Sequence, residues 1–197
     1  MARIGLSKPY VAAYSASGTT VTYASGASIG KFTKLELQLN SSENKFYADN
    51  GVAESDDQFG GGTVTISTDD LSPAAFKQVL GLAEENITGV SGVTTEGAKW
   101  QIFNDDQAIP FLGLGGVVKK KVGGAVKWVG IAFDRVQFRN PNETFETQGE
   151  TVVWNTPELI ADIFKSDNTK HSWRRVTTLL SSEAEAEAAV KAFLSIT

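Results

Sequence analysis

The sequence predicts a mainly β fold with two helices, arranged as a β-sandwich or barrel. Apolar and polar residues alternate along most of the chain with a period of two, which is typical of strands that bury one face. Glycine, threonine, valine and serine are frequent and long apolar runs are few, which also favours strands. The chain has 197 residues, of which 41% are hydrophobic and 21% charged, so we expect a single domain over residues 1–197.

The first half of the chain contains four expected strands. Residues 10–16 and 19–25 form a hairpin with a short turn between them. Residues 31–40 and 62–70 alternate cleanly, so one face of each strand should be buried and the other exposed. The polar insertion 41–61 separates these last two strands, and it is far longer than the turn that a compact domain needs.

A short helix and a long hairpin follow. Ser72 is a good N-cap, Pro73 suits the first helical position, and Gly81 follows the last apolar turn. A helix of this length is not stable alone in water, so it must pack against a sheet. Residues 109–121 and 125–138 then form a hairpin around a Gly-Gly turn.

The last part of the chain combines strands with the clearest helical pattern. Residues 150–156 alternate as a strand. Residues 156–164 begin with a threonine N-cap and a proline, as a helix does, yet they also alternate as a strand, so the local pattern leaves both open. Near the end, Ser182 and Glu185 form a capping box that predicts a C-terminal helix.

The glycine-rich segment 113–118 does not have the spacing of a phosphate-binding loop. No Walker A pattern can be laid on it, and no helical pattern follows it, as a dinucleotide fingerprint requires. We expect these glycines to let a strand bend or bulge.

Composition argues against several classes of function. The net charge of −5 disfavours a general nucleic-acid binder, and the absence of cysteine excludes disulfides, thiolate zinc sites and cysteine nucleophiles. The single histidine, His171, lies in a polar stretch, so the usual nucleophile–base pairs are hard to build. We expect no enzymatic activity, no catalytic metal and no cofactor. The start lacks a signal peptide and no apolar run reaches the length of a membrane span, so we expect no membrane contact.

The segment 45–55, KFYADNGVAES, combines an Asn-Gly pair with nearby acidic residues. Its spacing does not fit an EF-hand, although oxygen-rich loops bind calcium in other geometries, so a cation site stays open. An Asn-Gly pair between two short runs favours a hairpin, and aromatic residues on an extended arm favour a partner surface. The expected contact residues are Phe46, Tyr47, Asp49, Asn50, Gly51, Glu54, Asp56, Asp57 and Phe59.

Two segments of the chain carry opposite net charges. Residues 41–59 contain five acidic residues and one lysine, a balance of −4, and residues 117–139 contain six basic residues and one aspartate, a balance of +5. An acidic arm and a basic hairpin in one chain suit a head-to-tail assembly, although both could equally be solvated surface. The expected contact residues of the basic hairpin are Lys119, Lys120, Lys121 and Lys127.

Four stretches resemble the major tail protein (tail tube protein) family of long-tailed, non-contractile phages and prophages of Gram-positive bacteria. They are MARIGLSKPYVAAYSA, FYADNGVAES, TDDLSPAAFKQVLGL and GETVVWNTPEL. The resemblance covers nearly the whole chain and implies a tail-tube type β-sandwich or barrel with a flanking helix. A long inter-strand loop at about 41–61 and an N-terminal arm at about 1–9 would contact neighbouring subunits. The resemblance also favours a strand at 156–164, and we expect no appended Ig-like domain.

Proteins of this family form hexameric rings that stack into a tube, through which the genome passes into the host cell. The resemblance therefore implies a structural virion protein of the phage tail, assembled in the host cytoplasm. Its expected partners are further copies of itself, the tape measure protein, the tail terminator and the baseplate proteins. DNA would pass through the lumen without specific binding.

A tube that conducts DNA must not grip it, because lysine and arginine on its wall would bind phosphates. The outward faces of the two strands on either side of the insertion suit such a wall. The expected lumen-facing residues are Glu36, Gln38, Thr63, Thr65 and Ser67.

Two other functions stay open. The chain could be a monomeric β-sandwich module that binds carbohydrate on the aromatic residues of 46–59, because sandwich folds host many functions. It could also be a tail terminator or baseplate component of the same fold, which forms one ring and no tube. Oligomeric state distinguishes the three.

Overall fold

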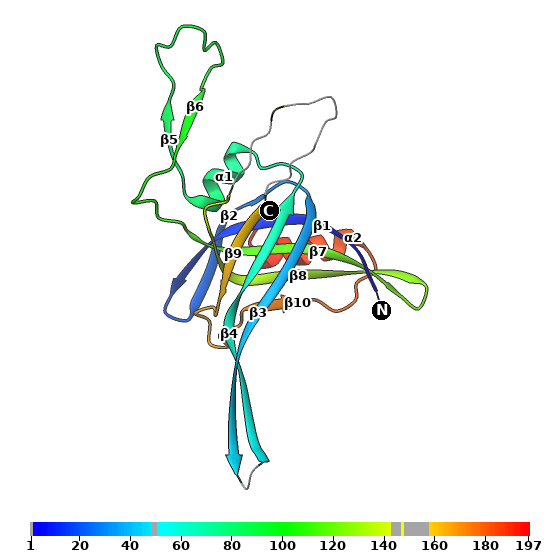
Figure 1. The fold of residues 1–197 in the computed structure, drawn as a ribbon. Coiled ribbons are helices and arrows are strands. Elements are labelled where there is room, and N and C mark those ends of the chain that lie inside the picture. Colours follow the sequence, from blue (N-terminus) through cyan, green and yellow to red (C-terminus); the bar gives the residue numbers. More distant parts are fainter. Residues whose placement is uncertain (1, 49–50, 143–146, 148–157) are drawn as a thin grey trace.

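The computed structural model describes residues 2–48, 51–142, 147 and 158–197, and within 41–58 it describes the backbone alone. Among these residues, eight strands form one antiparallel sheet in the order β2-β1-β7-β8-β9-β4-β3, with β10 paired to β8, and β5 and β6 form a small second sheet (Figure 1). The strands are β1 (Ala2–Ser17), β2 (Thr20–Ser28), β3 (Phe32–Ala48), β4 (Gly51–Thr68), β5 (Ala83–Asn86), β6 (Lys99–Ile102), β7 (Phe111–Val122), β8 (Ala125–Phe138), β9 (Glu158–Phe164) and β10 (Arg174–Val176). The helices are α1 (Pro73–Leu80) and α2 (Glu183–Phe193).

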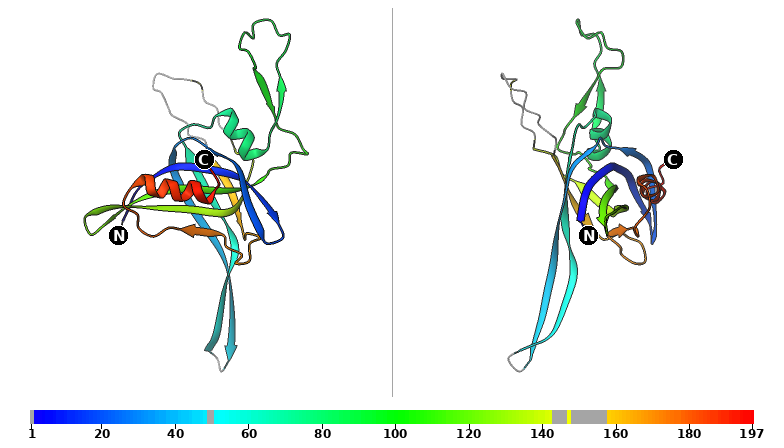
Figure 2. Two further views of the ribbon diagram at one scale, coloured as in Figure 1. Left: turned by 180° about the vertical axis from the view of Figure 1, so that it is seen from behind. Right: turned by 90° about the vertical axis from the view of Figure 1, so that its right-hand side faces the viewer.

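The large sheet folds on itself into two layers, and the predicted mainly β fold with two helices is confirmed. Figure 2 shows β3 and β4 in one layer and β1, β2 and β7 in the other, with α2 outside the second layer. Apolar side chains from both layers fill the space between them, among them Val11, Ile66, Leu114, Phe133 and Leu159, which are all almost fully buried. Burial of this core supplies the main driving force for the fold.

Helix α1 has the predicted caps and packs on the sheet as expected. The Ser72 hydroxyl accepts a hydrogen bond from the backbone N–H of Ala75 at 3.3 Å, and Gly81 ends the helix in the left-handed region with φ 67°. Val79 and Leu80 are fully buried in the main core. These contacts explain why a helix too short to exist alone is formed here.

Helix α2 lies over glycines of β7 and β8. A Cβ added at Gly115 would come within 2.5 Å of Val190 Cγ1, and one at Gly113 within 2.7 Å of Leu194 Cδ2. The β7–β8 register also shifts between Leu112 and Leu114, so the expected irregularity in this strand is present. The glycine-rich segment therefore has a further role, because it lets the helix approach the sheet closely.

The N-terminal segment is part of the sheet, which differs from the arm expected at residues 1–9. Ala2 pairs with Lys121 of β7, so β1 begins at the second residue. Helix α2 holds the segment further: Glu187 accepts a hydrogen bond from the Tyr10 hydroxyl at 2.5 Å and forms an ion pair with Lys8 at 3.3 Å. Pairing with a distant strand decides this conformation, and the local sequence does not reveal it.

Residues 158–164 form β9, which agrees with the strand favoured for 156–164. The strand expected at 150–156 lies outside the described residues. Within the described chain, no helix is long and apolar enough to cross a membrane.

The close packing of α2 leads to a stability prediction. Gly115→Ala should lower the free energy of unfolding by about 1–3 kcal/mol, because the new methyl group overlaps Val190. Val190→Ala removes the overlapping methyl groups, so the double variant should lose less stability than the sum of the two single losses. Urea unfolding of the four chains measures this, and strictly additive losses would show that the two residues do not interact.

Candidate functional site

The insertion 41–61 is a two-stranded ribbon that continues β3 and β4 away from the body. Pairing runs from Ser41 and Phe59 at the base to Ala48 and Gly51 near the tip. Figure 1 shows this ribbon extending well beyond the two layers. Two paired strands without a third strand or a core are marginally stable in water, so a surface of another molecule would stabilise them.

The expected acidic and aromatic contacts on this ribbon, apart from Phe59, lie on the part that projects from the body. Asp49 and Asn50, and with them the candidate cation site, lie outside the described residues. The register places Glu43 opposite Asp57, and acidic residues at directly opposed positions destabilise a ribbon unless a cation offsets them. The remaining contact residues on its backbone are Phe46, Tyr47, Gly51, Glu54 and Asp56.

Phe59 departs from the expected role as a free contact. Its ring stacks on Trp173 with centroids 4.5 Å apart and an angle of 3° between the planes, and it packs against the main core. Phe59 therefore anchors the base of the ribbon to the body. Trp173 comes from the segment before β10, far away in sequence, so no local pattern could have indicated this pair.

The basic hairpin formed by the ends of β7 and β8 gains a further cation from β1. The register sets Arg3 opposite Lys120 and Lys120 opposite Lys127, which gives a row of three positive residues across adjacent strands. Lys119 lies over the Trp128 ring, with its Nζ 5.2 Å from the ring centroid. In the described part of the chain, no carboxylate lies within ion-pair distance of this row.

Beneath this row the space between the layers opens as a groove, which we call the cationic groove. It has a volume of about 690 Å³ and lies between β3 and the layer formed by β1, β7, β8 and β10. Its floor is apolar, with Leu6, Leu35, Val118 and Ile131, and continues a buried cluster of the core. Its basic rim residues are Arg3, Lys120 and Arg174, and the ion pair of Lys34 with Glu36 lies at its β3 edge.

Arg174 is the most unusual member of this rim. Its Nε is buried and donates no hydrogen bond to any described residue. Burial lowers the pKa of its guanidinium, and the nearby charge of Arg3 lowers that pKa further. A buried donor without an acceptor is costly, so an anionic or carbonyl oxygen placed here would be bound favourably.

The expected lumen-facing residues lie on the outer face of β3 and β4. Glu36 is opposite Thr65, and Gln38 is opposite Thr63, and all four are at least partly exposed. Glu36 forms an ion pair with Lys34 at 2.7 Å and accepts a hydrogen bond from Gln38 Nε2 at 3.1 Å. The hydrogen bond from Lys34 is the main reason why the pKa of Glu36 lies below its usual range.

Ser67 differs from this expectation, because it is only 8% exposed. It lies in a central strand, with Lys34 opposite on β3 and Glu158 opposite on β9. A short serine between two long neighbours is covered by them, so Ser67 cannot present its hydroxyl as a free wall residue.

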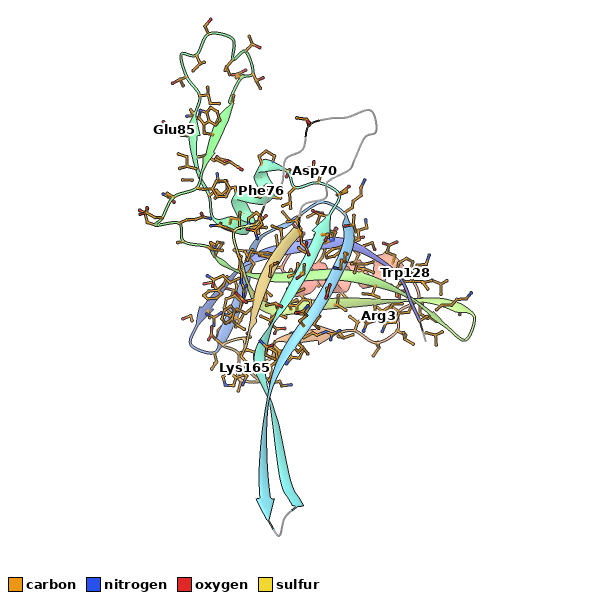
Figure 3. The ribbon with its side chains drawn as sticks, viewed as in Figure 1. Arg3, Asp70, Phe76, Glu85, Trp128 and Lys165 are labelled. Atoms are coloured by element: carbon orange, nitrogen blue, oxygen red, sulfur yellow. The ribbon has the colours of Figure 1, made fainter. Side chains whose placement is uncertain are left out.

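The hairpin of β5 and β6 is a second projection, which the sequence did not predict. It projects from the end of the body that carries α1 (Figure 3). Trp100 and Phe103 are 64% and 54% exposed, and Val90 and Val93 are also exposed. The apolar residues of this segment are separated by glycines and threonines without a clear period, so no strand pattern was recognisable.

Potential metal ligands do not cluster among the described residues. No group of three histidine, aspartate or glutamate side chains among them could hold a metal ion. His171 is an exposed turn residue with φ 49°, and its Nδ1 lies 3.3 Å from the Ser166 carbonyl oxygen.

Three surfaces therefore stand out: the β3–β4 ribbon, the basic row with the cationic groove below it, and the polar outer face of β3 and β4. No protein-family model matches the chain, and no curated protein matches it.

Proposed function

We propose that the chain is a structural virion protein that polymerises as stacked hexameric rings to form a phage tail tube. The observation that carries this proposal is the β3–β4 ribbon, which is built on strands of 17 and 18 residues although strands usually have about 5 or 6. Ordering such a ribbon costs backbone entropy that its own few contacts offset poorly. Contacts with a neighbouring copy would supply the missing stabilisation.

Charge complementarity supports head-to-tail contact between copies. The ribbon is acidic in sequence, whereas the basic row of Arg3, Lys120 and Lys127 has no ion-pair partner among the described residues. These surfaces occupy different parts of one molecule, so a contact between them joins different faces of two copies and can repeat. Electrostatic contact of this kind sets register and partner choice more than affinity.

The open edges of the sheet support closure into a ring. In the described chain, β2 and β3 end the main path of the large sheet, and β10, which pairs only with β8, is a further short edge. An unpaired edge is a template for pairing with another chain. In a ring of copies, neighbouring edges would join the sheets into one barrel around a lumen, as the resemblance to tail tube proteins implies.

The outer face of β3, β4 and β9 suits the wall of that lumen because its cations are neutralised. Lys34 is paired with Glu36, and Arg139 makes two hydrogen bonds to Asp162, the residue opposite Thr63. DNA binds to proteins chiefly through contacts of lysine and arginine with phosphates. A wall whose cations already have partners would let DNA slide through the lumen. Tape measure, terminator and baseplate proteins would complete the tail.

Charge reversal tests the contact between copies. Lys120→Glu with Lys121→Glu should raise the protein concentration needed for assembly by about ten-fold, which corresponds to about 1.4 kcal/mol. Adding Asp56→Lys and Asp57→Lys should partly restore assembly, because the pair of charges is then inverted. Lys165→Glu with Lys170→Glu is the control of equal charge change. Sedimentation velocity over a concentration series gives the midpoints, and no rescue by the second pair would rule out this pairing.

The wall assignment predicts a defect in DNA passage without a defect in assembly. Glu36→Lys with Thr65→Lys adds two cations and leaves Lys34 without its partner, so tubes should form but genome release from virions should slow several-fold. High salt should reduce the delay, because it screens phosphate contacts. Glu36→Gln with Thr65→Val is the uncharged control, and release at the wild-type rate by the lysine variant would contradict the assignment.

A further inference from the structure

The β5–β6 hairpin with its flanking residues, 83–106, forms an exposed projection that we call the apolar hairpin. Its two strands share four residue pairs and leave Trp100 64% exposed. Phe103, Val90 and Val93 are 54%, 55% and 42% exposed on the same projection. Exposed apolar side chains gathered on one projection mark an interaction surface rather than ordinary protein surface.

The apolar hairpin is also acidic. Residues 83–106 contain five acidic residues and one lysine, a balance of −4. Glu84 is held by Lys77 and Lys99 at 2.9 and 3.0 Å, but the structure gives the other acidic residues no ion pair with a described residue. The projection therefore combines exposed aromatic rings with carboxylates, and its partner should be an apolar surface with cations around it.

The cationic groove has this chemistry. Its floor of Leu6, Val118 and Ile131 is apolar, and the Arg174 guanidinium at its rim has a buried Nε without an acceptor in the described chain. Its volume of about 690 Å³ lies within the range of roughly 300–1,000 Å³ that is usual for binding pockets, so an aromatic side chain can enter it.

The hairpin and the groove lie on different sides of the molecule. Figure 3 shows Glu85 at the end of the body from which the hairpin projects, and Arg3 at the side of the body away from it. Both views of Figure 2 likewise place the hairpin at the opposite end of the body from the N-terminus. One copy therefore cannot fill its own groove, whereas a second copy can, and such a contact repeats head to tail.

We propose that the apolar hairpin of one copy inserts Trp100 into the cationic groove of the next copy. The carboxylates of the hairpin then meet Arg3 and Arg174 at the rim, and the indole covers the apolar floor. The inference rests on the proposed self-assembly and adds a second contact to the one made by the β3–β4 ribbon. The exposed aromatic rings of this hairpin suit the apolar floor, whereas the equally acidic ribbon would meet Lys121 and Lys127 at the end of β7 and β8.

Engineered cysteines test this contact directly, because the chain contains none of its own. Asn104→Cys beside Phe103 and Thr33→Cys at the groove are made in separate full-length chains, which are mixed under assembly conditions and mildly oxidised. The expected product is a disulfide between the two variants, identified by mass spectrometry of the linked peptides. Thr20→Cys, an exposed position outside the groove, replaces Thr33→Cys in the control and should give no such product.

A second variant measures the contribution of the indole. Trp100→Ala should raise the assembly midpoint at least ten-fold and Trp100→Phe much less, because the aromatic ring fills the groove. Leu179→Ala, at another exposed apolar residue, should leave the midpoint unchanged. Since Trp100 is exposed in the single chain, circular dichroism should show an unaltered fold.

The outcomes separate this inference from the proposed function. Assembly of the cysteine variants without the disulfide, or a disulfide from Thr33→Cys to Ser55→Cys in the ribbon instead, overturns the groove contact and leaves the tube proposal standing. An unchanged midpoint for Trp100→Ala also overturns it. A wild-type chain that stays monomeric at every concentration, even with a preformed baseplate complex as initiator, contradicts both proposals.

Discussion

The long antiparallel pairing between β3 and β4 is the constraint on which the other features depend. These strands pair from Phe32 and Thr68 in the core to Ala48 and Gly51 at the ribbon tip. Inside the body, Ile66 is fully buried, so a slip by one residue would expose the core face of β4. The buried half of the hairpin therefore sets the direction of the half that projects. The register shifts between Leu39 and Ser41, where the ribbon begins, and the Phe59–Trp173 stack secures that point.

The same sheet gives the molecule different surfaces on different sides. Where the layers separate, the apolar core continues into the floor of the cationic groove, and cations from β1, β7 and β10 gather at its rim. The acidic projections extend elsewhere, on the β3–β4 ribbon and on the apolar hairpin 83–106. A molecule with complementary surfaces on different faces forms repeating contacts rather than closed two-fold dimers. This asymmetry is the physical basis of the proposed polymer.

Much of the fold could be predicted because local rules govern it. The caps at Ser72 and Gly81 and the strand alternation depend on residues close in sequence, and they appear as expected. Non-local pairing decided the features that sequence reasoning missed. Pairing with β7 turns the expected N-terminal arm into a strand, and neighbours on β3 and β9 cover Ser67. The cationic groove depends on three such pairings at once, so no local pattern could reveal Arg3 and Arg174 as neighbours.

The central claim is self-assembly into tubes, and negative-stain electron microscopy of the purified chain across a concentration series tests it most directly. Light scattering on the same samples gives the concentration at which growth begins. The account predicts hollow tubes of stacked rings above that concentration. A chain that stays monomeric throughout the series, even when a preformed baseplate complex is added as an initiator, would contradict it.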